Sequence, residues 1–426
     1  MPEDVQPDRA QSDHRAQSDH RAQSDHRAEP QAVGAPRLTA GEHRRSDRRR
    51  GRIAVLVGLV LALALGAWLL GPKLFGSPKA PSDFVGEGKE DIVIEVNPGD
   101  SGSVIAQNLV DRNVIADVGM FISAASGNAA LAAIQPGYYQ LRTEIPAATA
   151  VQKLTDPASR VGKLVIPEGK QLDDISVIGS DTVTKGIFTL ISEASCLDLN
   201  DATRCVSAED LRAAAGDGPA SSLNVPDWAI EGAGTMGQSY RRLEGLIAPG
   251  TWNINPEASA KDILAKLVAE SGEHYVEGGL LEAATTMSIS PYEVLIVGSL
   301  VQKEAQPADF AKVARVIYNR LASDYDRLEF DSTVNYPLDR QEVATTDKDR
   351  ETKTPWNTYA MPGLPATPIC SPGDEALAAA ERPEPGDWLY FVTVDTDGTT
   401  LFTADYQEHL ANRDLALSSG VLDSGR

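Results

Sequence analysis

The stretch SPYEVLIVGSLVQKEA, residues 290–305, predicts a helix with a defined start and a long apolar face. Ser290 stands three residues before Glu293, which is the spacing of a capping box. Pro291 suits the first position of a helix, because its missing N–H would have no partner there. The sequence therefore predicts a helix that begins at Pro291 and runs through the apolar residues that follow.

Glu304 is placed at the end of this apolar face. Val297, Leu300 and Val301 precede it by seven, four and three residues, so all three share its side of the helix. Loss of water around a carboxyl favours the protonated form, which a general acid requires. The alternative is that the last turn points outward and leaves Glu304 in water or paired with a lysine.

Residues 53–70 form an apolar run without a charged residue. A run of about 18 such residues is long enough for a transmembrane helix. Arginines cluster before the run and Lys73 follows it, which predicts an N-terminus inside the cell and an extracytoplasmic remainder. A cleaved signal peptide is the alternative, but the run is long, a charged region of about 50 residues precedes it, and no Ala-x-Ala site follows. We expect a single-pass protein of the cytoplasmic (inner) membrane.

The tail, residues 1–52, is expected to be disordered, because the unit AQSDHR occurs three times from Ala10 to Arg27 in polar sequence. Its histidines would allow a metal site, but a solvated spacer fits the composition better. The formal net charge of the chain is −22, and the tail has a charge of about +2, so the rest of the chain carries about −24. Such an acidic surface argues against nucleic acid as a partner.

The cysteines and histidines leave little room for metal or thiol chemistry. Cys196 and Cys205 are nine residues apart in a polar stretch, and an extracytoplasmic location would permit a disulfide between them. Cys370 is then expected to be a free, partly buried thiol. A thiol nucleophile would need a histidine, and His274 and His409 are the only ones outside the tail. We predict no metal and no cofactor, which leaves chemistry by carboxylates.

Composition and periodicity predict an α+β fold divided into several parts. The pattern of apolar residues from residue 91 to residue 141 predicts the order β-α-α-β. The pattern in residues 176–241 does not predict where strands or helices begin and end. The expected strands and helices in the first part are a strand over 91–96, helices over 103–113, 118–133 and 147–154, and strands within 135–141 and 163–169. The first of these helices is expected to have Val104, Ile105, Leu109 and Val110 on one face. The expected domains are a tail over 1–52, a membrane helix over 53–70, a linker over 71–90, a small module over 91–175, a connecting region over 176–240, a main domain over 241–415 and a C-terminal tail over 416–426.

Several short motifs, in order along the chain, carry a resemblance to a known family. They are SLVQKEA at 299–305, VARVIYNRL at 313–321, FDSTV at 330–334, WNTY at 356–359, GLP at 363–365, PI at 368–369, SPG at 371–373, WLYFV at 388–392 and LFT at 401–403. The chain resembles the MltG/YceG-like endolytic murein transglycosylases, which are membrane-anchored bacterial enzymes that cut peptidoglycan glycan strands. Residues 91–169 resemble the LysM-like module of this family, and the main domain resembles its YceG-like catalytic domain.

The resemblance implies that Glu304 is the single catalytic acid and base. Protonated Glu304 would donate to the glycosidic oxygen of a MurNAc-GlcNAc bond, and its carboxylate would then take the proton of the sugar's 6-hydroxyl, closing a 1,6-anhydro ring. The residues implied to bind the sugars are Glu244, Asn319, Asp331, Ser332, Thr333, Asn357 and Tyr359. Asn, Asp and Ser in loops also form turns and caps without touching a ligand.

The sequence departs from the family at a few positions. Gln302 stands where relatives commonly have a glutamate, Gly250 replaces an aspartate, and the segment around Cys196 and Cys205 resembles an insertion. Two other functions follow from these residues: a glycan-binding scaffold without activity, or a muramidase in which Asp331 is a second catalytic carboxylate. The implied partners are peptidoglycan glycan strands, the cytoplasmic membrane and, from the family, penicillin-binding protein synthases.

Overall fold

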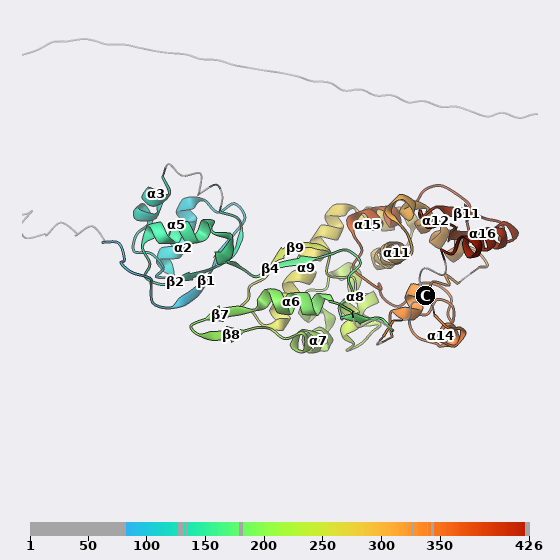
Figure 1. Cartoon of the computed structure of the whole chain (residues 1–426), viewed down its shortest axis with the longest axis horizontal. Coiled ribbons are helices and arrows are strands. Elements are labelled where there is room, and N and C mark those ends of the chain that lie inside the picture. Colours follow the sequence, from blue (N-terminus) through green and yellow to red (C-terminus); the bar gives the residue numbers. More distant parts are fainter. Residues whose placement is uncertain are drawn as a thin grey trace, which may run out of the picture. The chain divides into compact units, whose positions relative to one another are not determined.

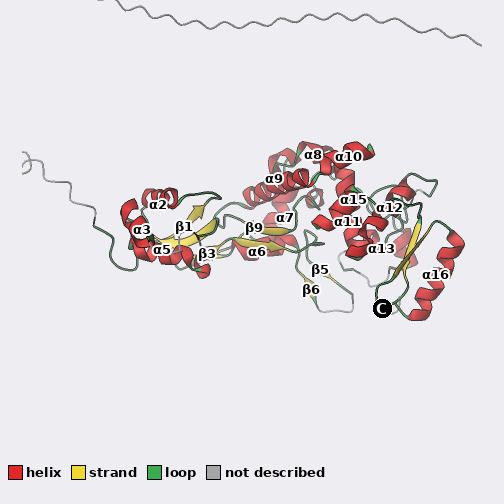
Figure 2. Ribbon diagram, turned by 90° about the horizontal axis from the view of Figure 1, so that it is seen from above, coloured by secondary structure: helices red, strands yellow, loops and turns green. Residues whose placement is uncertain are grey.

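The computed structural model describes residues 82–126, 132, 134–178, 182–325, 327–338, 340–341 and 345–421. These residues form a mixed α and β structure within one compact unit, Ala80–Arg426 (Figures 1 and 2). The predicted transmembrane helix lies outside the described residues. Among the described residues no single helix has the length and apolar character to span a membrane, although one pair bent by 102°, Leu280–Met287 with Pro291–Glu304, meets both conditions together.

The first part of the described chain has the predicted β-α-α-β order. Its elements are β1 (Asp91–Val96), α2 (Gly102–Asp111), α3 (Val118–Ala125), β2 (Gly137–Arg142), α5 (Ala147–Thr155) and β3 (Arg160–Val161). The three strands form an antiparallel sheet in the order β1-β2-β3, with Asp91 opposite Arg142. Their apolar side chains pack with those of the helices, including Ile94, Leu109 and Phe121.

Two predictions in this part need correction. Val104 was expected on the apolar face of its helix, but it is 51% exposed, whereas Ile105 and Leu109 are buried. The second helix was expected to reach residue 133, but α3 ends at Ala125 because Ser126 takes an extended conformation at its C-cap.

Residues 176–241, for which the sequence analysis assigned no elements, form short strands, short helices and 3-10 turns. These are β5 (Ile175–Ser176), β6 (Val183–Thr184), α6 (Ile187–Ser195), β7 (Leu197–Leu199), β8 (Ala202–Arg204), α7 (Ala208–Gly216), a 3-10 turn at Ala220–Leu223, α8 (Asp227–Gly234) and a 3-10 turn at Tyr240–Leu243. The structure joins Cys196 to Cys205 by a disulfide, which closes the β7–β8 hairpin. Strand β4 (Lys163–Ile166) precedes this region and pairs with β9 (Gly250–Asn253) after it.

The remaining chain is mostly helical. It contains α9 (Ala260–Gly278), α10 (Leu280–Met287), α11 (Pro291–Glu304), α12 (Phe310–Leu321), α13 (Asp331–Asn335), α14 (Asp347–Glu351), α15 (Asp374–Glu381), the β10–β11 hairpin (Tyr390–Thr393 and Thr400–Thr403) and α16 (Tyr406–Ser419).

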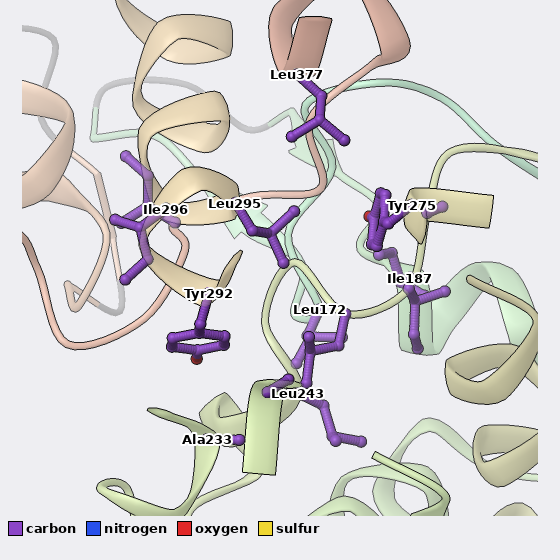
Figure 3. Packing of buried hydrophobic residues seen from close by; sticks show 14 of the residues in the cluster. Leu172, Ile187, Ala233, Leu243, Tyr275, Tyr292, Leu295, Ile296 and Leu377 are labelled. Carbon is purple, nitrogen blue, oxygen red and sulfur yellow. The ribbon is translucent and has the colours of Figure 1, made fainter. Parts of the chain in front are cut away.

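Helix α11 is the centre of the apolar core. It starts with the predicted capping box, since Ser290 accepts from the Glu293 N–H and Glu293 accepts from the Ser290 N–H. All of its residues from Val294 to Val301 are buried. Figure 3 shows Leu295 reaching from this helix into the cluster that contains Leu172 and Tyr275. The buried helix fixes the position of its last residue, Glu304.

Candidate active site

Glu304 stands where the buried part of α11 ends. Val297, Leu300 and Val301, the residues predicted to share its face, are fully buried, whereas Glu304 is partly exposed. Loss of hydration raises the pKa of the Glu304 carboxyl to about 7. Both the protonated and the ionised form of the carboxyl are therefore present near neutral pH.

Two residues of α13 and one of α12 act directly on this carboxyl. The Ser332 hydroxyl donates a hydrogen bond to Glu304 Oε1, and this bond favours the ionised form. The negative charge of Asp331 favours the protonated form, and the positive charge of Arg320 opposes it. Because these effects partly cancel, desolvation decides the direction of the pKa shift.

Asp331 is held by a cation and a phenol. Its Oδ2 is 3.1 Å from Arg350 Nη2, and its Oδ1 accepts from the Tyr359 hydroxyl at 2.8 Å. The Arg350 guanidinium also lies 5.1 Å from the centre of the Tyr359 ring. Asp331, Ser332 and Tyr359, three of the residues predicted to bind sugar, thus meet beside Glu304. Burial and the charge of Asp331 raise the pKa of Tyr359, and the charge of Glu304 adds a smaller contribution.

Thr333 and Asn357 are buried, which supports a positioning role for them and not the predicted contact with a ligand. The Thr333 hydroxyl donates to the Phe330 carbonyl at 2.6 Å and lies 2.9 Å from the Thr358 hydroxyl. The Asn357 amide donates to the carbonyls of Asp349, Arg350 and Thr352, at the end of α14. These bonds fix α13 and α14 and so position Ser332 and Arg350.

Asn319 lies away from Glu304. Its amide donates to the carbonyls of Gly386 and Trp388 at 3.1 and 2.9 Å, which ties α12 to the segment before β10. It lines a cavity together with Glu293, at the opposite end of α11. Eleven residues separate Glu293 from Glu304, which is about 16 Å along a helix. The structure does not bring Asn319 together with the other predicted site residues.

Glu244, unlike Glu304, is buried, with 1% of its surface exposed. Its carboxyl accepts from the Leu172 N–H at 3.2 Å and from the Tyr336 hydroxyl at 2.8 Å. Burial raises the pKa of this carboxyl to about 7, and the two hydrogen bonds oppose the shift. Glu244 lines a cavity of about 580 Å³, in keeping with the predicted place in a groove.

Three residues to which the sequence analysis gave no role hold the site together. Arg350 binds Asp331, as described above. Lys303 Nζ donates to the Gly169 carbonyl at 2.7 Å, and Gln302 Oε1 accepts from the Gly373 N–H at 2.8 Å. Gln302 therefore anchors the segment before α15, a task that its spacing in the sequence does not indicate.

The remaining cysteine and histidines are engaged elsewhere. Cys370 is buried, which raises the pKa of its thiol to about 12, and its Sγ lies 3.4 Å from the Ser299 carbonyl. His274 pairs with Asp374 at 2.8 Å, and the His409 ring stacks on Tyr390. In the part of the chain that the structure describes, no group of three or more His, Cys, Asp and Glu side chains could hold a metal ion.

Comparison with known proteins gives a consistent result. The model of the YceG-like family matches residues 94–414. An endolytic murein transglycosylase of Bacillus subtilis is 28% identical over 362 residues, which cover 83% of this chain and 91% of the relative. An endolytic murein transglycosylase of Streptococcus pneumoniae serotype 2 is 26% identical over 294 residues, and the chain spans 50% of that relative's length. A YceG-like protein of Listeria monocytogenes, known from a crystal structure, is 28% identical, with a TM-score of 0.48 over 76% of this chain and 99% of its own.

Proposed function

The chain belongs to the YceG-like family, and from this premise we propose that it is an endolytic murein transglycosylase. It cuts MurNAc-GlcNAc bonds within peptidoglycan glycan strands and leaves 1,6-anhydroMurNAc ends. In this way it ends the elongation of nascent strands.

The observation that carries the proposal is the place of Glu304 at the end of the buried helix α11, where Ser332 donates to its carboxyl and the Asp331–Tyr359 pair lies beside it. The Glu304 pKa of about 7 leaves both the acid and the carboxylate well populated at neutral pH. A single group that first gives and then takes a proton is most effective in this range. No second carboxylate is needed, because the nucleophile is the sugar's own hydroxyl.

We assign the steps as follows. Protonated Glu304 donates to the glycosidic oxygen while the bond to the anomeric carbon breaks, and the leaving strand departs with a hydroxyl. The Glu304 carboxylate, hydrogen-bonded by Ser332, then accepts the proton of the 6-hydroxyl as its oxygen bonds to the anomeric carbon. The Tyr359 ring, held by Asp331, supplies an aromatic face for the sugar beside the bond that breaks.

The structure favours this assignment over a muramidase. In a muramidase Asp331 would attack the sugar or activate a water molecule. Both of its oxygens are instead occupied by Arg350 and Tyr359. A scaffold without activity is disfavoured in turn. Gln302, the departure from the family that suggested it, accepts a hydrogen bond from the Gly373 N–H, and burial raises the pKa of Glu304 as a general acid requires.

We further propose that residues 53–70 anchor the enzyme in the cytoplasmic membrane, with its catalytic domain on the outer side. The apolar run and the arginines before it support this topology. The β-α-α-β order of residues 91–142 supports a LysM-like module that binds glycan. Penicillin-binding protein synthases are the proposed partners, because they make the strands on which the enzyme acts.

The test is the product pattern of Glu304→Gln. The amide cannot donate as an acid, so we expect a loss of about 10²–10⁴ in the rate of anhydro-end formation, without a change in melting temperature. Mass spectrometry of digested glycan strands measures the products. The matched control is Glu282→Gln, an exposed glutamate on α10, which should cleave like the wild type.

Near-normal release of anhydro ends by Glu304→Gln would overturn the assignment. Reducing ends in place of anhydro ends would identify a muramidase. Strand binding by the wild type without any product would identify a scaffold.

A further inference from the structure

The cavity at Glu244 is built from charged and aromatic side chains, which sets it apart from the apolar core beside it. Its volume of about 580 Å³ falls within the range of small-ligand sites. The residues that decide its chemistry are Arg212, Arg241, Asp173, Tyr240, Tyr336 and Glu244.

A single turn of helix joins this cavity to the proposed catalytic centre. The Tyr336 N–H donates to the Ser332 carbonyl at 3.0 Å, so Tyr336 stands one turn after the residue that binds Glu304. One turn of helix is about 5.4 Å long. The Tyr336 hydroxyl donates to Glu244 inside the cavity. Tyr336 therefore belongs both to the wall of the cavity and to the segment that carries Ser332, the partner of Glu304.

Arg241 is a cation of the cavity that forms no ion pair with a described residue; burial raises the pKa of the neighbouring Glu244 carboxyl, and the charge of Arg241 opposes that rise. Its guanidinium carbon lies 5.3 Å from the Tyr240 ring centre, 5.0 Å from that of Tyr336 and 5.3 Å from that of Trp356. Its one hydrogen bond among the described residues goes to the Tyr336 carbonyl, at 3.3 Å. Within that same set of residues it makes no ion pair.

The second arginine of the cavity differs in this respect. Arg212 also stacks on Tyr240, at 5.0 Å, but it is paired with Asp173 at 2.6 Å. Arg241 therefore keeps several N–H donors in a fixed plane, which is the arrangement that binds a carboxylate in a bidentate manner. Exposed acidic side chains, Asp174 and Glu209, line the same cavity and suit an amino group.

We propose that this cavity binds the peptide stem of the glycan strand, with Arg241 on one of the stem's carboxylates. The inference rests on the proposed function, because it names the part of the murein substrate that lies beside the scissile bond. A stem peptide carries carboxylates and an amino group on a short chain, which matches the charges of the cavity. The sugar backbone offers mainly hydroxyl groups and would leave Arg241 without a partner.

The test compares two glycan strands from one preparation, with stems intact and with stems removed by an amidase. The full-length chain carries Arg241→Met, which keeps the apolar length and removes the charge. We expect KM for the intact strand to rise about 10- to 100-fold, because a hydrogen-bonded charge pair is lost. We expect kcat to change little and KM for the stripped strand to stay constant. Arg241→Lys keeps the charge without the planar fork and should fall between Arg241→Met and the wild type.

A second measurement does not depend on cleavage. Calorimetric titration of a free stem tetrapeptide into the Glu304→Gln chain should give binding, and adding Arg241→Met should abolish it. Equal rises in KM for both strands, or tetrapeptide binding that ignores Arg241, would overturn the inference. A wild type that cleaves neither strand would contradict the proposed function, and the titration would still test the cavity.

Discussion

At the scale of single residues, Glu304 is balanced by neighbours that act on its pKa in opposite directions. Ser332→Ala removes a donor that favours the carboxylate, so the Glu304 pKa should rise above about 7. Asp331→Asn removes a negative charge and leaves Arg350 unpaired, so the pKa should fall. A general acid works in its protonated form. The alkaline limb of the kcat/KM profile should therefore move to higher pH in Ser332→Ala and to lower pH in Asp331→Asn, in assays of strand cleavage.

Asp331→Asn also separates two mechanisms. If Asp331 is only a neighbour of the acid, the Asp331→Asn enzyme should cleave strands at a rate within about tenfold of the wild type, measured at the variant's own pH optimum. If Asp331 is a second catalytic carboxylate, the same substitution should lower the rate by about 10²–10⁴. Glu282→Gln, remote on α10, should leave the profile unchanged. Alkaline limbs that shift the same way in both site variants would disprove the balance of charges described here.

The position of Glu304 at the end of a buried helix could be predicted from the sequence because that signal is local, whereas its catalytic role came from the resemblance to the family. Three apolar residues at helical spacing and one capping box place the carboxyl, and the structure has both. Its partners could not be predicted in the same way. Ser332 is 28 residues from Glu304, and Arg350 is 19 residues from Asp331, in a short helix with no pattern of its own. Such contacts depend on how the segments fold back on one another.

At the scale of elements, Asn357 provides a test of positioning against contact. Its side chain donates three hydrogen bonds to carbonyls in and after α14, the helix that carries Arg350. Asn357→Ala leaves these partly buried acceptors without the buried amide that binds them and should lower the free energy of unfolding by about 1–3 kcal/mol. Activity should fall mainly through kcat, because Arg350 and Asp331 lose their arrangement. Thermal melting and steady-state kinetics measure the two effects.

A direct role for Asn357 in binding sugar would give the reverse result, with an unchanged melting temperature and a raised KM. Thr352→Val is a suitable control, since its exposed hydroxyl bonds only to the Lys348 carbonyl within the same turn. It should alter neither quantity by much.

Elements with strong local signals were predicted well, and those held by distant contacts were not. Strand β1 has the predicted bounds, Asp91–Val96, because its apolar residues alternate. Residues 176–241 gave no assignment because their strands are only two or three residues long and pair as small hairpins. Val104 was misplaced because apolar character alone does not tell which of two adjacent residues on a helix faces the core.

At the scale of the whole molecule, the β7–β8 hairpin connects regions far apart in the sequence. Asn200 and Asp91 exchange two hydrogen bonds of 2.8 Å, each backbone N–H donating to the other's side chain. Gln140 donates to the Asp198 carbonyl at 2.6 Å. Leu197 and Leu199 pack with Val93 and Tyr138 in a small apolar cluster of their own. The disulfide, the short β7–β8 ladder and a hydrogen bond from the Thr203 hydroxyl to Asp198 Oδ1 hold the hairpin's own shape, so its contacts depend on them.

Removal of the disulfide should therefore weaken more than the hairpin. The Cys196→Ser, Cys205→Ser variant frees a loop of about ten residues in the unfolded chain, which should cost roughly 2–3 kcal/mol of stability. The melting temperature should fall, and limited proteolysis should cut between Leu197 and Arg204 faster than in the oxidised wild type. A reductant should reproduce both effects in the wild type and have none in the double variant, where the buried Cys370 is the remaining thiol. If a reductant does not change the melting temperature of the wild type, the contacts of the hairpin with the sheet and the apolar cluster are sufficient to stabilise the fold without the disulfide.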